Sequence, residues 1–226
     1  WYDFDPKYKG GYRSWWGFET LPEVNEETPS FVEFITGEGG VIDTWLRRGA
    51  AGFRLDVADE LPDEFIEKIR TAVKRVNPEK FLLGEVWEDA TTKFGFDHRR
   101  TYLLGKGLDS VMNYPFKNSV LDFVKGKPAQ QAANEILSIC EHYPAPAINT
   151  ALNFLSTHDT ERALTVIADE PANGRGREWQ SGRSVTGEAY EEGMLRLRMA
   201  YAIIYTLPGV PCLYYGDEIG MQGYRD

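Results

Sequence analysis

The sequence has few residues of the kinds that hold metals, and no stretch suited to crossing a membrane. Its 226 residues include two cysteines and three histidines. Cys140 and Cys212 lie too far apart to form a metal-binding cysteine cluster, so we expect two free, buried thiols. No apolar run is long enough for a bilayer span, and no signal peptide opens the chain. We therefore expect no metal, no cofactor, no membrane contact and a cytoplasmic location.

Runs of basic residues are also missing. Lysine and arginine total 25 against 35 aspartates and glutamates, a net charge of −10, which makes nucleic acid and anionic membranes poor partners. A hydrophobic content of 42% excludes disorder and is enough for a sizeable core. Aromatic residues are abundant, with twelve Tyr, twelve Phe and six Trp, and their faces suit carbohydrate rings as well as protein cores.

Strand and helix patterns alternate along the chain. Strands are expected at 51–57, 81–87, 108–114, 150–155 and 209–215. Helices are expected at 30–47 with a break at 37–40, at 61–77, 115–125 and 128–142, shortly after 159, and at 188–205. Residues 1–30 are expected to form a long ordered loop, and 170–187 a polar excursion. This alternation predicts an α/β protein with a parallel sheet and helical crossovers, and it does not separate a barrel from an open sheet.

The stretch 51–59 places charge in a strand that should be apolar on both faces. Arg54 and Asp56 alternate with apolar residues, the period of two that is typical of a strand. In a buried parallel strand, an inward Arg and Asp are costly unless they meet each other or a substrate. Two interpretations stay open: a structural ion pair in the interior, or an anionic nucleophile kept ionised by its neighbouring cation.

Carboxylates occur at the carboxyl ends of several predicted strands, and some have a basic neighbour: Asp56 with Arg54, Glu85, and Asp159 with His158. Such ends meet at one edge of a parallel sheet, so these side chains should share a cleft. Scattered, solvated carboxylates are the alternative, and we favour it for Asp217 and Glu218. A nucleophile with a general acid is the equipment for cleaving glycosidic bonds. Glu85 has the drier local setting, which would raise its pKa and keep it protonated.

Three motifs, in order and at predicted strand ends, resemble those of the α-amylase family of glycoside hydrolases: GFRLD at 52–56, GEVW at 84–87 and FLSTHD at 154–159. The segment LPEVN at 21–25 resembles the fifth short motif of that family, in the form found in neopullulanases and cyclomaltodextrinases. Residues 210–221 resemble its last barrel strand and the following loop. The resemblance covers nearly the whole chain, and its closest likeness is to neopullulanase, cyclomaltodextrinase and α-glucosidase-type members.

The resemblance implies a fold and a reaction. Residues 1–226 would be the C-terminal part of a single catalytic TIM (β/α)8 barrel, with 1–30 as the long loop after strand 3 and 51–226 as strands 4 to 8 with their helices. The implied enzyme is a retaining glycoside hydrolase that cleaves α-1,4 glucosidic bonds in starch-derived oligosaccharides. Cleavage of α-1,6 bonds, chain-length preference and oligomeric state stay open.

The same resemblance implies roles for the three acids. Asp56 would be the nucleophile that forms a covalent glycosyl-enzyme intermediate, and Glu85 the acid that protonates the leaving oxygen and then acts as base. Asp159 would hold sugar hydroxyls in the distorted ring of the transition state. Retention requires the Asp56 and Glu85 carboxyl groups to lie about 5–5.5 Å apart.

Neighbouring residues would support these acids. Arg54 would contact and orient Asp56, and His158 would bond sugar hydroxyls near Asp159. Trp87 would form an aromatic wall of the sugar site, with ordinary packing as the alternative. No metal ligands are evident, although the resemblance leaves calcium open for a full-length parent.

The departures from the family pattern lead to further expectations. The family's first motif, an Asp a few residues ahead of Asn-His, is absent, as are the first three barrel strands, and the chain begins with Trp1. We therefore expect a piece of a longer protein that, in isolation, associates through open strand edges and turns over poorly. Asp59-Glu60 stands where neopullulanase-like members have Asn-Glu. The alternatives are an α-glucan transglycosylase, or an inactive carbohydrate-binding fragment.

Overall fold

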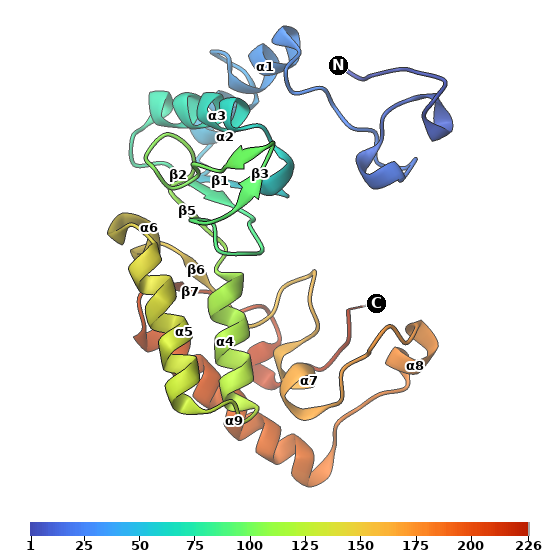
Figure 1. Ribbon diagram of the computed structural model, residues 1–226, viewed down its shortest axis with the longest axis vertical. Coiled ribbons are helices and arrows are strands. Elements are labelled where there is room, and N and C mark those ends of the chain that lie inside the picture. The colour runs from blue at the N-terminus through green and yellow to red at the C-terminus, as the bar shows by residue number, and fades with distance from the viewer. Residues whose placement is uncertain (226) are drawn as a thin grey trace. The chain divides into compact units, whose positions relative to one another are not determined.

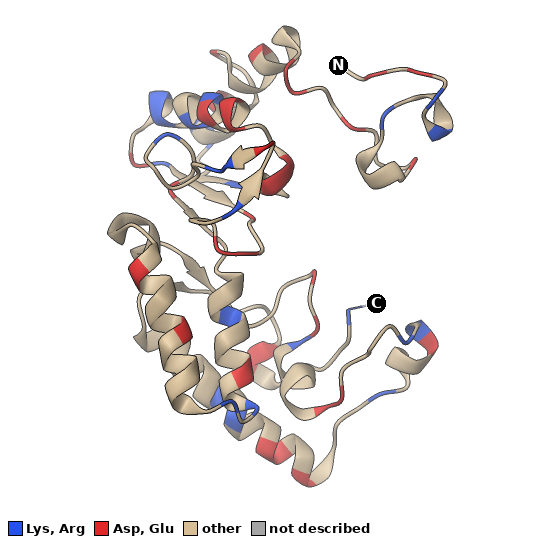
Figure 2. Ribbon diagram, viewed as in Figure 1, with Lys and Arg blue, Asp and Glu red and all other residues tan. Residues whose placement is uncertain are grey.

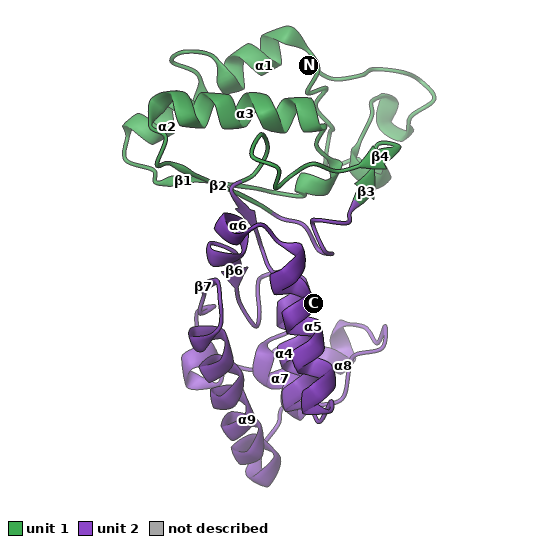
Figure 3. Ribbon diagram, turned by 60° about the vertical axis from the view of Figure 1, so that its left-hand side comes forward, with its two compact units in different colours: residues 1–84, 94–108 green, residues 85–93, 109–226 purple. Residues whose placement is uncertain are grey.

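The computed structural model describes residues 1–225. Asp226, the last residue of the predicted barrel segment, lies outside the described residues. The chain divides into two compact units (Figure 3). The first unit contains Trp1–Gly84 and Phe94–Leu108, and the second contains Glu85–Lys93 and Asp109–Asp226.

The first unit contains short helices, a parallel strand pair and a small hairpin (Figure 1). Its helices are α1 (Pro29–Thr36), α2 (Val41–Arg47) and α3 (Asp63–Val76), and its strands are β1 (Gly52–Leu55), β2 (Phe81–Gly84), β3 (Phe94–Gly95) and β4 (His98–Arg99). The predicted break at 37–40 is confirmed, because α1 ends before it and α2 begins after it. The β3–β4 hairpin was not predicted, since its turn uses Phe96 and Asp97 at positive φ in place of the usual glycine.

Helix α3 follows from its sequence. It buries an apolar stripe that includes Ile66, Ile69 and Val73, at the helical spacing that predicts one core-facing side. Acidic residues lie in its first turn and basic residues in its last turn, which complements the helix dipole (Figure 2). Helices α1 and α2 both pack against α3.

Strands β1 and β2 are parallel, in a register that pairs Gly52 with Phe81 and Leu55 with Gly84. A Cβ at position 52 would lie 2.0 Å from the Phe81 carbonyl oxygen, so this close approach requires glycine. Both strands are shorter than the predicted 51–57 and 81–87. Asp56 and Glu85 therefore lie directly after strands, where the backbone is no longer held by the hydrogen bonds of the sheet.

The second unit is mostly helical. Its elements are β5 (Ser110–Val111), α4 (Tyr114–Val124), α5 (Ala129–His142), α6 (Ala145–Asn149), β6 (Leu152–Asn153), α7 (Ala163–Ala168), α8 (Arg177–Ser181), α9 (Gly187–Thr206) and β7 (Val210–Pro211). Helix α6 was not predicted, because Pro144 and Pro146 indicate a break although the first turn of a helix tolerates proline. Helix α8 lies inside the predicted excursion, where no apolar stripe marks it.

The strand pair β6–β7 is parallel, as predicted, and is shorter than the predicted strands. Buried Asn153 fixes it: its side chain accepts a hydrogen bond from Asn113 Nδ2 at 3.0 Å and donates one to the Pro208 carbonyl at 2.8 Å. A buried amide with both ends bonded specifies one register, since any shift would leave its polar atoms unpaired.

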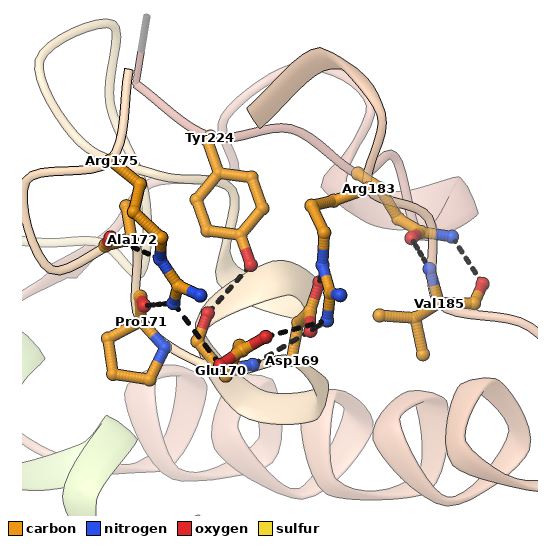
Figure 4. A network of polar contacts seen from close by, with 9 residues as sticks. Asp169, Glu170, Pro171, Ala172, Arg175, Arg183, Val185 and Tyr224 are labelled. Carbon is orange, nitrogen blue, oxygen red and sulfur yellow. Dashed lines mark hydrogen bonds and ion pairs between the residues drawn. The ribbon is translucent and has the colours of Figure 1, made fainter. Parts of the chain in front are cut away.

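The excursion after α7 is fastened by charge (Figure 4). Arg183 pairs with Asp169, and its guanidinium holds the pKa of that carboxyl below the usual range. Arg175 pairs with Glu170 at 3.2 Å, and the Tyr224 hydroxyl donates to the Glu170 carbonyl at 2.6 Å. Ion pairs therefore hold the excursion at residues 170–187 in place, and the Tyr224 hydrogen bond joins it to the C-terminal segment.

Both cysteines are free thiols, as predicted, but they are half-buried rather than buried. Burial raises the pKa of each thiol above its ordinary value. Within residues 1–225, no helix combines the length and the apolar character that a membrane span needs.

Candidate active site

Asp56 lies at the end of β1 as an accessible carboxylate. Its side chain is 75% exposed and forms an ion pair with the half-buried guanidinium of Arg54, two residues earlier on the strand. This confirms the predicted contact between Arg54 and Asp56. The exposure favours an available carboxylate over a structural pair sealed in the interior.

The backbone directly after Asp56 is strained. Val57 has φ 43° and ψ 50°, the left-handed region, which a β-branched residue rarely adopts and which costs about 1–3 kcal/mol. The turn leads into the short helix η3 (Ala58–Glu60). Such strain concentrates at functional sites, and here it takes the chain sharply away from the end of β1.

A cavity of about 490 Å³ lies beside Asp56. Its lining includes Asp56, residues 21–24 of the LPEVN motif and Glu60. Two of the motifs recognised in the sequence thus meet in one cavity. The volume falls within the usual range for small-molecule sites.

Arg100 fixes the turn after Asp56, which contributes Glu60 and Leu61 to the cavity lining. Its buried side chain donates to the Asp63 carboxylate at 2.9 Å and to the carbonyls of Asp59 at 2.7 Å and Leu61 at 2.6 Å. The Tyr102 hydroxyl donates to Asp59 Oδ1 at 3.1 Å. The segment following Asp56 is therefore held by one buried cation.

Replacing Arg100 by Met should lower the free energy of unfolding by about 3–5 kcal/mol, because a carboxylate and two carbonyls would lose their buried donor. Urea titration followed by circular dichroism measures this loss. The control is Lys106→Met, which removes a cation at an exposed position six residues further along the chain and should change stability by less than about 0.5 kcal/mol. Equal effects of the two substitutions would contradict the role given to Arg100.

Glu85 has surroundings of a different kind from those of Asp56. It is 3% exposed, and its carboxylate accepts hydrogen bonds from Trp87 Nε1 at 3.1 Å and the Tyr114 hydroxyl at 3.5 Å. The Trp87 and Tyr114 rings stack with centroids 4.1 Å apart. The predicted dry setting of Glu85 is confirmed. Trp87 is 42% exposed, so it packs on Tyr114 and still presents surface to a ligand.

Asp159 and His158 follow β6 on a tight turn. His158 Nε2 lies 3.1 Å from Asp159 Oδ2, and the two side chains are 63% and 32% exposed. The Asp159 amide donates to Thr157 Oγ1 at 3.2 Å. Both residues can therefore offer polar atoms to a hydroxylated ligand.

The expectation of a solvated Asp217 was wrong, whereas Glu218 is exposed as expected. Asp217 is buried and accepts hydrogen bonds from Ser156 Oγ and from the Tyr201 hydroxyl at 2.7 Å. The left-handed Gly216 turns this carboxylate inward. Burial and this carboxylate raise the pKa of Tyr201 above its ordinary value. Asp217 thereby anchors the turn that carries His158 and Asp159, a role that no strand periodicity indicates.

Arg162 supports the same anchor. Its guanidinium lies 3.5 Å from Asp217 Oδ1 and 4.4 Å from the ring centroids of both Tyr214 and Tyr215. It also donates to the Tyr215 carbonyl. This residue was not predicted, because its position three residues after Asp159 gives no signal of a contact with residues 214–217.

Comparison with known proteins decides the family. The model of the alpha amylase catalytic domain matches residues 7–226. The chain belongs to the alpha-amylase family. Arg54 and Asp56 of this alpha-amylase domain lie in the first unit, and Glu85, Trp87, His158 and Asp159 in the second. The expected separation of the Asp56 and Glu85 carboxyl groups stays a prediction.

The relatives of this alpha-amylase domain include glycosidases of several specificities. It is 33% identical over its whole length to an amylopullulanase of Thermoanaerobacter thermohydrosulfuricus, of which it spans 16%. It is 33% identical to a cyclomaltodextrinase of a Bacillus species, with 92% of this chain and 32% of that protein aligned. The chain thus spans less than a third of either relative.

A solved structure gives the same relationship in three dimensions. The domain aligns with a cyclic α-maltosyl-(1→6)-maltose hydrolase from Arthrobacter globiformis in complex with its substrate. The TM-score is 0.79 at 27% identity, and the alignment covers all of this chain and 45% of that one. The mixed α/β chain therefore corresponds to part of a TIM-barrel enzyme.

Groups of three or more His, Cys, Asp or Glu side chains placed to hold a metal ion do not occur among the residues that the structure describes.

Proposed function

We propose that this chain supplies the carboxylates of a retaining glycoside hydrolase that cleaves α-1,4 glucosidic bonds in starch-derived oligosaccharides, with α-1,6 bonds as a second target. The observation that supports it best is the exposed Asp56, paired with Arg54 at the edge of a cavity. An ionised, accessible carboxylate is what nucleophilic attack on an anomeric carbon requires.

In the proposed reaction, an Asp56 carboxylate oxygen attacks the anomeric carbon while Glu85 donates its proton to the departing glycosidic oxygen. A glycosyl ester of Asp56 forms and the C–O bond to the leaving sugar breaks. Glu85, now a carboxylate, takes a proton from water, which attacks the same carbon and releases Asp56. Asp159 and His158 bind sugar hydroxyls, and Trp87 gives the ring an aromatic surface.

The proposal extends to architecture. We assign β1, β2, β5, β6 and β7 to strands 4 to 8 of a (β/α)8 barrel, with residues 1–30 as the loop that precedes them. Strand-end positions of Asp56 and Glu85 support this, because barrel sites are built at the carboxyl ends of strands.

The test is the stereochemistry of hydrolysis by the full-length protein. Proton NMR of a maltoheptaose digest should show the α-anomer as the first product, since two displacements retain configuration. Initial release of the β-anomer would contradict the mechanism. Early appearance of oligosaccharides longer than the substrate would indicate transfer to a sugar hydroxyl instead of water.

A further inference from the structure

Glu60 binds two tryptophans at once. It lies in η3, four residues after Asp56. Its Oε2 accepts a hydrogen bond from Trp15 Nε1 at 2.5 Å, and its Oε1 accepts one from Trp16 Nε1 at 2.8 Å. Both oxygens of this carboxylate therefore already serve indole groups. Hydrogen bonds to a charged acceptor are the stronger kind, so they orient both rings firmly.

The two indoles form a stacked pair. Their ring centroids lie 4.7 Å apart with an interplanar angle of 15°. Consecutive side chains normally point in different directions, and here the left-handed backbone of Trp16, at φ 50°, brings them together. That conformation is strained for a bulky residue. The carboxylate of Glu60 offsets this strain by holding both rings in place.

This pair stands at the cavity beside the proposed nucleophile. Trp15 and Glu60 line the same cavity of about 490 Å³ as Asp56. Trp16 stacks against Trp15 and is 74% exposed. An indole fixed from behind by a second indole presents a rigid apolar surface, which loses little conformational entropy when a ligand binds.

The charge of the cavity lining limits the classes of ligand that could bind there. The charged side chains that line the cavity are all carboxylates, namely Asp56, Glu60, Glu23 and Glu26. Arg13 pairs with Glu23 at 2.9 Å and Arg54 pairs with Asp56, but neither arginine itself lines the cavity. Such a lining repels anions, whereas hydroxyl groups can donate to it. A neutral ring with apolar faces and hydroxyl edges suits the cavity better than a phosphorylated or carboxylated sugar.

We infer that Trp15 is a specificity-determining residue that receives a neutral glucosyl ring of an α-glucan beside Asp56, and that Glu60 is a positioning residue for the indole pair rather than a sugar ligand. The identity of the glucan rests on the proposed function. The rigid aromatic wall, by which we mean the stacked indoles of Trp15 and Trp16, rests only on the contacts of these two residues with each other and with Glu60.

Binding is measured by isothermal titration of maltoheptaose into the full-length protein carrying Asp56→Asn, so that turnover does not interfere. Adding Trp15→Ala should weaken binding about 3- to 10-fold, the range expected for one aromatic contact. The matched control is Trp45→Ala, which removes another half-exposed indole, 52% exposed, that lies outside the cavity lining. The control should bind as tightly as the parent. Equal affinity of the two variants would overturn the inference.

Glu60→Gln separates positioning from sugar binding. Glutamine keeps one acceptor oxygen and places an N–H donor against the second indole. Near-ultraviolet circular dichroism should therefore lose part of the stacked-indole signal, and with active protein KM should rise while kcat stays within about twofold. An unchanged dichroism spectrum together with a raised KM would make Glu60 a direct sugar ligand and overturn its positioning role.

Two further results distinguish this inference from the proposed function. Weaker maltoheptaose binding by the Trp15→Ala variant of a protein that cleaves no α-glucan would support the wall and contradict the proposed hydrolase. Cleavage of α-glucan by the parent protein, together with unaltered binding by the Trp15→Ala variant, would support the proposed hydrolase and contradict the aromatic wall. Maltoheptaose phosphate should bind more weakly than maltoheptaose, and tighter binding would contradict the charge argument.

Discussion

Replacing Asp56 by Asn in the full-length protein should lower kcat on maltoheptaose by roughly 10⁴- to 10⁶-fold, the scale seen when a catalytic nucleophile is removed. The amide is a poor nucleophile and cannot form the glycosyl ester, although it keeps the size of the carboxylate. Initial rates by reducing-sugar release measure the loss, and mass spectrometry of protein quenched during turnover should show the glycosyl adduct only in the unsubstituted protein.

The control for this loss is Asp97→Asn, which makes the same change in the β3–β4 turn at an exposed site. It should leave kcat within about twofold. An Asp56→Asn variant that keeps more than about a tenth of the parent rate would contradict the nucleophile assignment, because no residual route should be so fast.

Replacing Glu85 by Gln should slow the cleavage of substrates whose leaving group needs a proton much more than that of substrates whose leaving group does not. On maltoheptaose, whose alkoxide needs a proton, kcat should fall by about 10²- to 10⁴-fold. A fluoride leaving group needs little protonation, so maltosyl fluoride should still glycosylate Asp56, and the intermediate should then accumulate because no base activates water. Stopped-flow detection of a fluoride burst measures this. Gln keeps the acceptor for Trp87 Nε1, so the surroundings of the site should persist.

The comparison variant is Glu88→Gln, an exposed carboxylate close by in sequence. It should behave as the parent on both substrates. Equal losses on maltoheptaose and maltosyl fluoride in Glu85→Gln would remove Glu85 from the role of acid.

The sequence predicted those features that depend on local pattern. The stripe of α3 and the break between α1 and α2 come from residue spacing alone, and the structure confirms them. The contact of Arg54 with Asp56 was predictable because residues two apart in extended chain lie on the same side, and Asp56 directly follows the strand that carries Arg54. The catalytic roles of the acids stay predictions.

Features that depend on distant contacts were missed. Glu60 meets tryptophans some 45 positions earlier, and Asp217 meets Ser156 61 positions earlier. Period and propensity carry no information about such pairs, because tertiary packing alone brings them together. Asp217 illustrates the error: as one of two adjacent acids after a glycine it has the local pattern of a solvated turn, and Gly216 turns it into the interior.

The left-handed Val57 has a consequence for protein engineering. A selection for heat resistance alone should readily yield Val57→Gly, since glycine adopts the left-handed conformation without strain. The same exchange would free the hinge immediately beside Asp56, so the reaction would lose the fixed direction of its attacking oxygen. Thermostability and turnover should therefore trade against each other at a single backbone position.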